Sequence, residues 1–143
     1  MRSPRIILLI FILLMAATFG DPTAAFSVSR FFFSGDGAIH MAGEKNGEDF
    51  SGQYRLPDGR YDPAALSAIC RVFDAPCDAP DSMVSLRLVE YLDFLQDRLS
   101  PDGRITIVSG YRSPAYNARI RKQGALAATA SLHQYGMAAD LVM

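Results

Sequence analysis

The 143-residue sequence has no excess of charge of either sign, because 14 Lys and Arg residues stand against 15 Asp and Glu residues. Domains that bind nucleic acid usually carry a basic patch or stripe, so the composition argues against a nucleic-acid partner. Internal repeats and low-complexity tracts are also absent. The length suits one domain with one hydrophobic core.

A long hydrophobic run is missing as well. The apolar stretch at residues 6–17 is shorter than the roughly 20 residues that a membrane-spanning helix needs. Two arginines precede it and small residues at 23–25 follow it, which is the pattern of a secretory signal peptide. We therefore predict a signal peptide over residues 1–25 and a mature, exported or periplasmic domain over residues 26–143. The protein would then contact the membrane only through its signal segment, before cleavage. The alternative is an uncleaved N-terminal anchor.

Cysteine is scarce, with only Cys70 and Cys77 present. In an oxidising compartment this pair could close a small disulfide loop. The spacing does not fix the Cα separation, however, so a disulfide and a pair of thiols both stay open. A zinc site built on this pair is disfavoured, because no second pair of ligands accompanies it.

The hydrophobic periodicity predicts an α+β fold, with helices packed on a small, mainly antiparallel sheet and the candidate site at the strand ends. Two helix starts are marked by a capping residue followed by proline, at Asp62 and at Ser113. The expected elements are a hairpin of strands 29–33 and 38–41 around a turn at 34–37, a short strand at 49–55, helices at 62–73 and 82–99, a strand at 104–108, a helix at 114–123 and a strand at 137–142. The buried stripe expected on the second helix is Leu88, Tyr91 or Leu92, Leu95 and Leu99.

His133 and Asp140 are candidate ligands of one metal ion. Two ligand atoms of zinc must come within about 3.5 Å of each other, and a gap of seven residues achieves this neither on a helix nor on a strand. The chain must therefore turn between them, and Gly136 permits such a turn at low steric cost. The alternatives are a hydrogen-bonded histidine and an aspartate at a strand edge, and spacing alone favours these over a metal site.

Arg112 and Ser131 are the other candidate site residues. Arg112 follows a predicted strand and a glycine, in the kind of loop where ligands bind at a sheet edge. Arginine recognises carboxylates through a two-pronged hydrogen bond, although position alone favours a surface arginine or one paired with a nearby acid. Ser131 is either a residue that orients a ligand or a capping serine, and His40 is expected at the surface.

These residues form a joint pattern that resembles a known family. Ser-Gly-Tyr-Arg-Ser-Pro at residues 109–114 is followed by Asn117 and then by Ser-x-His-x-x-Gly-x-Ala-x-Asp at residues 131–140. Segments 31–37, 60–66 and 85–88 extend the likeness upstream, so that it covers nearly all of the predicted mature chain. The pattern resembles the zinc murein peptidases of the D-alanyl-D-alanine carboxypeptidase superfamily, and within it the murein endopeptidase K family.

The resemblance implies a role for each candidate residue. His133 and Asp140 correspond to the first two Zn²⁺ ligands, Arg112 to an arginine that holds the substrate, and Ser131 to a serine of the site. The family's second histidine ligand and its acidic general base lie further along the chain and find no counterpart in residues 1–143. We therefore expect a C-terminally incomplete family member, inactive unless that segment is supplied.

The function implied is zinc-dependent hydrolysis of peptide bonds in peptidoglycan, with peptide stems as the partner. Two alternatives are kept. The protein is a D-alanyl-D-alanine carboxypeptidase, or it is a non-catalytic envelope protein that binds peptidoglycan. The oligomeric state cannot be inferred from the sequence.

Overall fold

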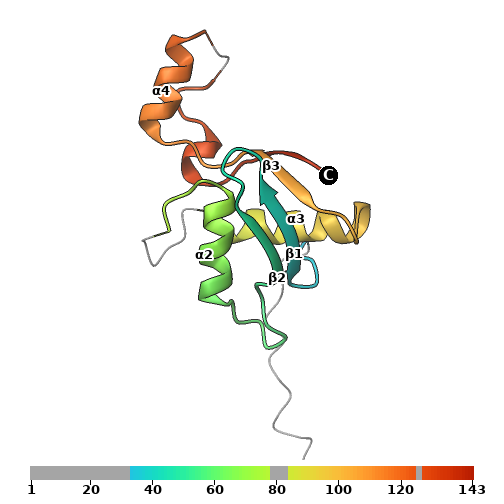
Figure 1. The fold of residues 1–143 in the computed structure, drawn as a ribbon. Coiled ribbons are helices and arrows are strands. Elements are labelled where there is room, and N and C mark those ends of the chain that lie inside the picture. Colours follow the sequence, from blue (N-terminus) through green and yellow to red (C-terminus); the bar gives the residue numbers. More distant parts are fainter. Residues whose placement is uncertain (1–32, 78–83, 125–126) are drawn as a thin grey trace, which may run out of the picture.

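The computed structural model describes residues 33–77, 84–124 and 127–143 (Figure 1). The predicted signal peptide lies outside these residues. Among the described helices, none combines the length and apolar character that crossing a membrane would require. The elements are, in chain order, β1 (Ala38–Gly43), β2 (Asp49–Gln53), α2 (Pro63–Val72), α3 (Leu86–Leu99), β3 (Ile105–Ser109), α4 (Pro114–Lys122), the 3-10 helix η1 (Leu132–Tyr135) and β4 (Asp140–Val142).

The four strands form one sheet in the order β2-β1-β3-β4. The β1–β2 and β3–β4 pairs are antiparallel and the β1–β3 pair is parallel. The prediction of an α+β fold with a mainly antiparallel sheet is thus confirmed.

The predicted hairpin around residues 34–37 is wrong. One edge of β1 pairs with β2. On the other edge, Met41–Gly43 pair with β3 and His40 bonds the Gln96 side chain, so the hairpin partner of β1 is the strand that follows it. Phe33, the described end of the expected first strand, lies in a turn. Its ring packs edge-on against Tyr91 and Phe94 of α3. Its contacts are therefore with a helix, and residues 29–32 lie outside the described part.

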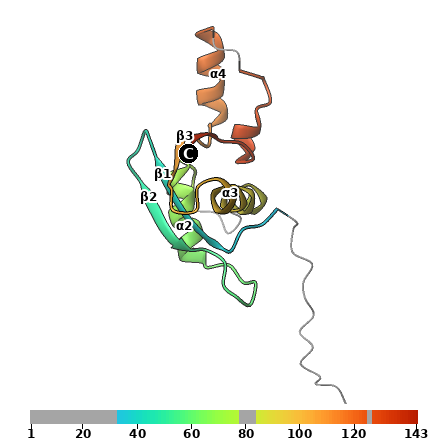
Figure 2. The ribbon, with the colours of Figure 1, turned by 90° about the vertical axis from the view of Figure 1, so that its right-hand side faces the viewer.

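The core lies between the sheet and the two longer helices. Alternate residues of β1 and β3 point to one face, and Ile39, Met41, Ile105 and Ile107 are buried there. Figure 2 shows α2 and α3 on this same side of the sheet. Both views show α4 projecting beyond the end of the sheet (Figures 1 and 2).

The two predicted helix starts are confirmed. The Asp62 carboxylate accepts hydrogen bonds from the backbone N–H groups of Ala64 and Ala65 at the start of α2. The Ser113 hydroxyl accepts one from the N–H of Tyr116 at the start of α4. These side chains satisfy donors that the first turn of a helix leaves without partners.

The predicted apolar stripe of α3 is confirmed in part, because Leu92 is buried and Leu88 and Leu95 pack against the core. Tyr91 and Leu99 are 42% and 69% exposed. The helix instead buries three polar side chains together with Val89 and Leu92; the three are Glu90, Asp93 and Gln96. Each of these has hydrogen-bond partners in segments distant along the chain. Hydrophobic periodicity within the helix cannot predict such partners. Described α3 begins at Leu86, and residues 82–83 of the predicted helix lie outside the described part.

Cys70 and Cys77 are thiols in the structure rather than a disulfide. Cys70 is buried in the core. The thiol of Cys77 lies 3.3 Å from the carbonyl oxygen of Ala75. Of the two readings left open by the sequence, the structure therefore contains the pair of thiols.

Candidate functional site

The segment that leaves β3 is fixed against the end of α2. The backbone N–H of Tyr111 donates to the carbonyl of Phe73 at 2.8 Å. Gly110 is buried, and a Cβ built on it would lie 2.4 Å from that same carbonyl oxygen. Only glycine permits this close approach of two backbones. The loop after β3 is thereby held in one position.

His133 is anchored to this loop. Its ring Nδ1 lies 2.7 Å from the carbonyl oxygen of Gly110, and its own carbonyl accepts a hydrogen bond from the N–H of Arg112 at 3.1 Å. A carbonyl can only accept, so Nδ1 carries a proton, and in the neutral imidazole Nε2 then holds the lone pair. The side chain is 12% exposed. The ring is thus oriented with Nε2 as its free acceptor.

Asp140 faces that acceptor from the start of β4. Its Oδ1 lies 3.7 Å from His133 Nε2, and its Oδ2 accepts a hydrogen bond from Arg112 NH2 at 2.7 Å. The Nε of Arg112 donates in turn to the Ser109 hydroxyl at 3.0 Å. A shift of register in the β3–β4 pair sets Ser109 opposite Asp140. The structure therefore brings together three of the four predicted site residues.

The chain turns between the two candidate ligands as predicted. Gly136 ends η1 in the left-handed conformation, with φ 60° and ψ 26°. Met137 N–H donates back to the carbonyl of Leu132, and β4 begins only at Asp140. The strand is therefore shorter than the expected 137–142, because its first residues complete the turn.

Ser131 stands apart from this cluster. It occupies the N-cap position of η1, but its side chain makes no capping hydrogen bond. Its carbonyl accepts from the N–H of Gln134. Among the described residues, no hydrogen bond joins its hydroxyl to His133, Asp140 or Arg112. The role of Ser131 stays a prediction.

Comparison with known protein families decides the family. The family model described as Peptidoglycan L,D-endopeptidase MepK matches residues 36–143. The chain belongs to this family. The match covers every described residue from Asp36 onward, including the His133–Asp140 pair. No curated protein and no solved structure gave a match. Peptidase action on peptidoglycan is thus established at the level of the family.

The donor set at His133 and Asp140 fits a zinc ion. Ligands at bond lengths of about 2.0–2.2 Å in a tetrahedral site stand roughly 3.3–3.5 Å apart, and the observed 3.7 Å lies within a few tenths of an ångström of this. Each residue also has the outer partner that metal ligands usually have. For His133 it is the Gly110 carbonyl, and for Asp140 it is Arg112.

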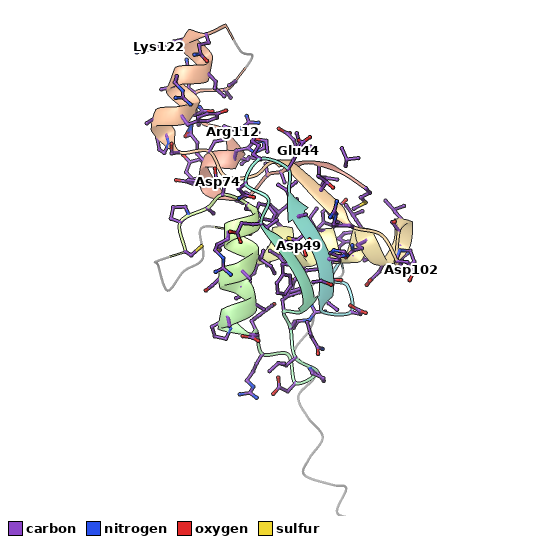
Figure 3. All side chains as sticks on the ribbon, viewed as in Figure 1. Glu44, Asp49, Asp74, Asp102, Arg112 and Lys122 are labelled. Carbon is purple, nitrogen blue, oxygen red and sulfur yellow. The ribbon has the colours of Figure 1, made fainter. Side chains whose placement is uncertain are left out.

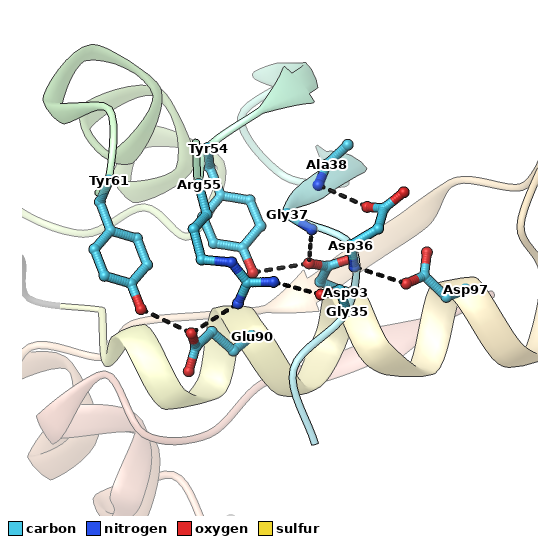
Figure 4. A network of polar contacts seen from close by, with 10 residues as sticks. All are labelled: Gly35, Asp36, Gly37, Ala38, Tyr54, Arg55, Tyr61, Glu90, Asp93 and Asp97. Carbon is cyan, nitrogen blue, oxygen red and sulfur yellow. Dashed lines mark hydrogen bonds and ion pairs between the residues drawn. The ribbon is translucent and has the colours of Figure 1, made fainter. Parts of the chain in front are cut away.

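A second acidic group lies elsewhere, between α3 and the segment that enters β1 (Figure 4). Asp36, Asp93 and Asp97 each offer an oxygen within 4.8 Å of the others, an arrangement that could hold a metal ion. Asp93 Oδ2 accepts hydrogen bonds from Tyr54 Oη and the N–H of Gly37. Its Oδ1 is buried without a hydrogen-bond partner. Burial raises the pKa of Asp93 to about 6, and the charges of Asp97 and Asp36 add to this.

The same face of α3 holds a buried ion pair. Arg55 NH1 lies 2.9 Å from Glu90 Oε1, and both side chains are almost fully buried. Tyr61 Oη donates to that same oxygen at 2.7 Å, and Arg55 also donates to the carbonyl of Gly35. Burial, together with the Glu90 carboxylate, raises the pKa of Tyr61. These polar contacts join the segment between β2 and α2, and the segment that enters β1, to α3 (Figure 4).

Sequence reasoning missed two contributors to the site. Gly110 and Ser109 lie in the recognised motif, yet only the structure shows that they support His133 and Arg112. The acidic group left a weak signal, since Asp93 and Asp97 are four residues apart on one helix face. Nothing in the sequence indicated that Asp36 would join them.

Proposed function

We propose that this protein is a zinc-dependent peptidoglycan endopeptidase in which His133 and Asp140 are two of the metal ligands. The observation that carries the proposal is the 3.7 Å approach of His133 Nε2 to Asp140 Oδ1. The family match over residues 36–143 supports peptide stems of peptidoglycan as the substrate. The bond cut would be of the L,D type named in the family description.

The chain's own residues would prepare this site before substrate binds. The Gly110 carbonyl holds the His133 tautomer that leaves Nε2 unprotonated. Arg112 binds one oxygen of Asp140 and leaves the other facing His133. The Arg112 side chain is 19% exposed, so part of its guanidinium can also reach a substrate carboxylate. Ser131 remains a proposed substrate contact.

Bound zinc would supply a Lewis acid that polarises the scissile carbonyl and lowers the pKa of a water molecule. Catalytic zinc usually has three protein ligands and one open position. Within residues 33–77, 84–124 and 127–143, no further His, Cys, Asp or Glu forms a metal-binding group with His133 and Asp140. The third ligand and the general base are therefore proposed without residue numbers.

An exported or periplasmic location is part of the proposal. Peptidoglycan lies outside the cytoplasmic membrane, so the enzyme must cross that membrane to meet it. The pattern of residues 1–25 supports this.

The test incubates purified protein, supplied with zinc, with cross-linked muropeptides and identifies the products by mass spectrometry. Splitting of L,D-linked dimers into monomers, and its loss in His133→Ala, would support the endopeptidase. Release of free D-alanine from monomers would instead identify a carboxypeptidase. His40→Ala is the matched control, because His40 lies on β1 beside Asp49 and away from the site.

A second candidate is a protein that binds peptidoglycan without cutting it. It is favoured by one observation, the lack of a third metal-binding side chain beside the pair among the described residues. Retention of the protein on purified sacculi, with intact muropeptides in the digestion assay, would favour this candidate.

A further inference from the structure

A pocket of about 340 Å³ adjoins the His133–Asp140 pair, because the loop after β3 lines both. Its wall includes two cations, Lys45 and Arg112, and one carboxylate, that of Asp74. Tyr111 and Tyr116 add aromatic surface. Figure 3 shows Asp74 and Arg112 at the same end of the molecule, far from Asp102. The pocket therefore presents both signs of charge beside the candidate metal ligands.

Among the described residues, the opposite charges in this wall are not joined by an ion pair. Within the described part of the chain, the ion pairs include neither Lys45 nor Asp74. Arg112 uses its Nε and NH2 for Ser109 and Asp140, so NH1 is the guanidinium nitrogen left for a ligand. Both Lys45 and Asp74 are exposed. The pocket wall thus carries one acceptor, the Asp74 carboxylate, and two donors, Lys45 and Arg112.

The backbone at Asp74 is held in an uncommon conformation. Its φ is 57°, and it is the only non-glycine residue with a positive φ among those described. Its N–H donates to the carbonyl of Arg71. The preceding Phe73 is tied to Tyr111 and pressed against Gly110. A non-glycine residue in this region is a reason to look for function, and here the conformation places a carboxylate in the pocket wall.

We propose that this pocket binds the zwitterionic α-amino-acid centre of a stem peptide, that is, a carbon bearing both a free ammonium and a free carboxylate. Asp74 receives the ammonium, and Lys45 with Arg112 NH1 receives the carboxylate. Tyr111 and Tyr116 cover the adjoining carbon chain. The inference rests on the proposed function, because it assigns the pocket to the substrate of the His133–Asp140 site.

The charge pattern favours a zwitterion over simpler ligands. A lone anion would meet Lys45 and Arg112 but also the repulsion of Asp74. A lone cation would meet Asp74 but also the repulsion of two positive side chains. Only a group that carries both charges can pair with Asp74, Lys45 and Arg112 together. The second α-centre of a diamino acid, left free when its other amine is in peptide linkage, has this chemistry.

The test is a binding titration that does not depend on hydrolysis. The probe is a short stem peptide ending in a diamino acid with one free α-centre. Two blocked peptides are compared with it, one N-acetylated and one carboxamidated at that centre. The variants are Asp74→Asn, which suits the left-handed backbone, and Lys45→Met. Asp102→Asn and Lys122→Met are the matched controls. Binding is followed by calorimetry at pH 7.

We expect each blocked peptide to bind about five- to tenfold more weakly than the zwitterion, as for loss of one charge-assisted contact. Asp74→Asn should weaken the zwitterion by a similar factor while leaving the N-acetylated peptide unchanged. Lys45→Met should also weaken binding of the zwitterion by a similar factor, while leaving binding of the carboxamidated peptide unchanged. The inference is overturned if the three peptides bind equally, if none binds, or if the control variants have the same effect as Asp74→Asn.

The two proposals fail separately. Binding that follows the expected pattern, but without hydrolysis of any muropeptide, would leave the pocket standing and remove the enzyme. Hydrolysis that is lost in His133→Ala but unaffected by Asp74→Asn and Lys45→Met would keep the enzyme and remove the pocket.

Discussion

Asp93 on α3 is fully buried, and we expect Asp93→Asn to stabilise the protein at neutral pH. One carboxylate oxygen accepts hydrogen bonds from Tyr54 Oη at 2.8 Å and from the N–H of Gly37 at 2.9 Å. The amide oxygen of asparagine can accept both. The other oxygen has no partner, so its replacement by an uncharged amide removes a buried charge and breaks none of these hydrogen bonds.

The magnitude follows from the pKa of Asp93, which burial raises from 3.8 to about 6. Between these two values the folded state binds more protons than the unfolded state, so the free energy of unfolding falls as pH rises through this window. A shift of about two units corresponds to roughly 3 kcal/mol. The contribution is fully present below pH 3.8 and is lost above about pH 6. Because asparagine does not titrate, the free energy of unfolding of the variant lacks this fall with pH.

The assay is urea unfolding of wild type and Asp93→Asn at several pH values between 4 and 7.5, with a chelator present to keep metal off the three carboxylates. The variant's free energy of unfolding, minus that of wild type, should rise by about 2–3 kcal/mol from pH 4 to pH 7.5. Asp102→Asn, at an exposed carboxylate, is the control and should give a flat difference. A flat difference for Asp93→Asn as well would refute the reasoning.

Three further changes test local arguments by urea unfolding. Asp62→Ala removes the cap of α2 and should cost about 1 kcal/mol; an unchanged midpoint would contradict this. Gln96→Leu leaves the backbone N–H and carbonyl of His40 without their hydrogen-bond partner and should lower the free energy of unfolding by about 2–3 kcal/mol. A smaller loss of stability than for Asp62→Ala would be evidence against the buried network. Gly110→Ala forces a Cβ against Phe73 and should cost about 1–3 kcal/mol. It should also weaken zinc binding, since His133 loses its fixed partner.

Local signals in the sequence predicted the fold where local chemistry decides it. The caps at Asp62 and Ser113 lie beside the helices that they begin, so a short window of sequence contains the whole cause. Strand β3 was predicted for the same kind of reason, as a β-branched run between two turns. The face of α3 was not predictable in this way. Glu90 is buried because Arg55 and Tyr61, distant in sequence, bring it hydrogen bonds.

The candidate site shows the same division. The need for a turn between His133 and Asp140 followed from bond lengths and from Gly136, and the structure contains that turn. The hydrogen bond from Arg112 to Asp140 spans 28 residues. Sequence alone could not choose between Arg112 as a substrate contact and Arg112 as the partner of an acid, and the structure shows the second.

Zinc titration of the purified protein tests the central claim most directly. Wild type and His40→Ala should bind zinc equally, while His133→Ala and Asp140→Asn should bind at least about tenfold more weakly. Asp97→Asn is included because Asp36, Asp93 and Asp97 form the other candidate metal group. Unchanged zinc affinity in His133→Ala, with loss of affinity in Asp97→Asn, would place the metal at the acidic group and contradict the account.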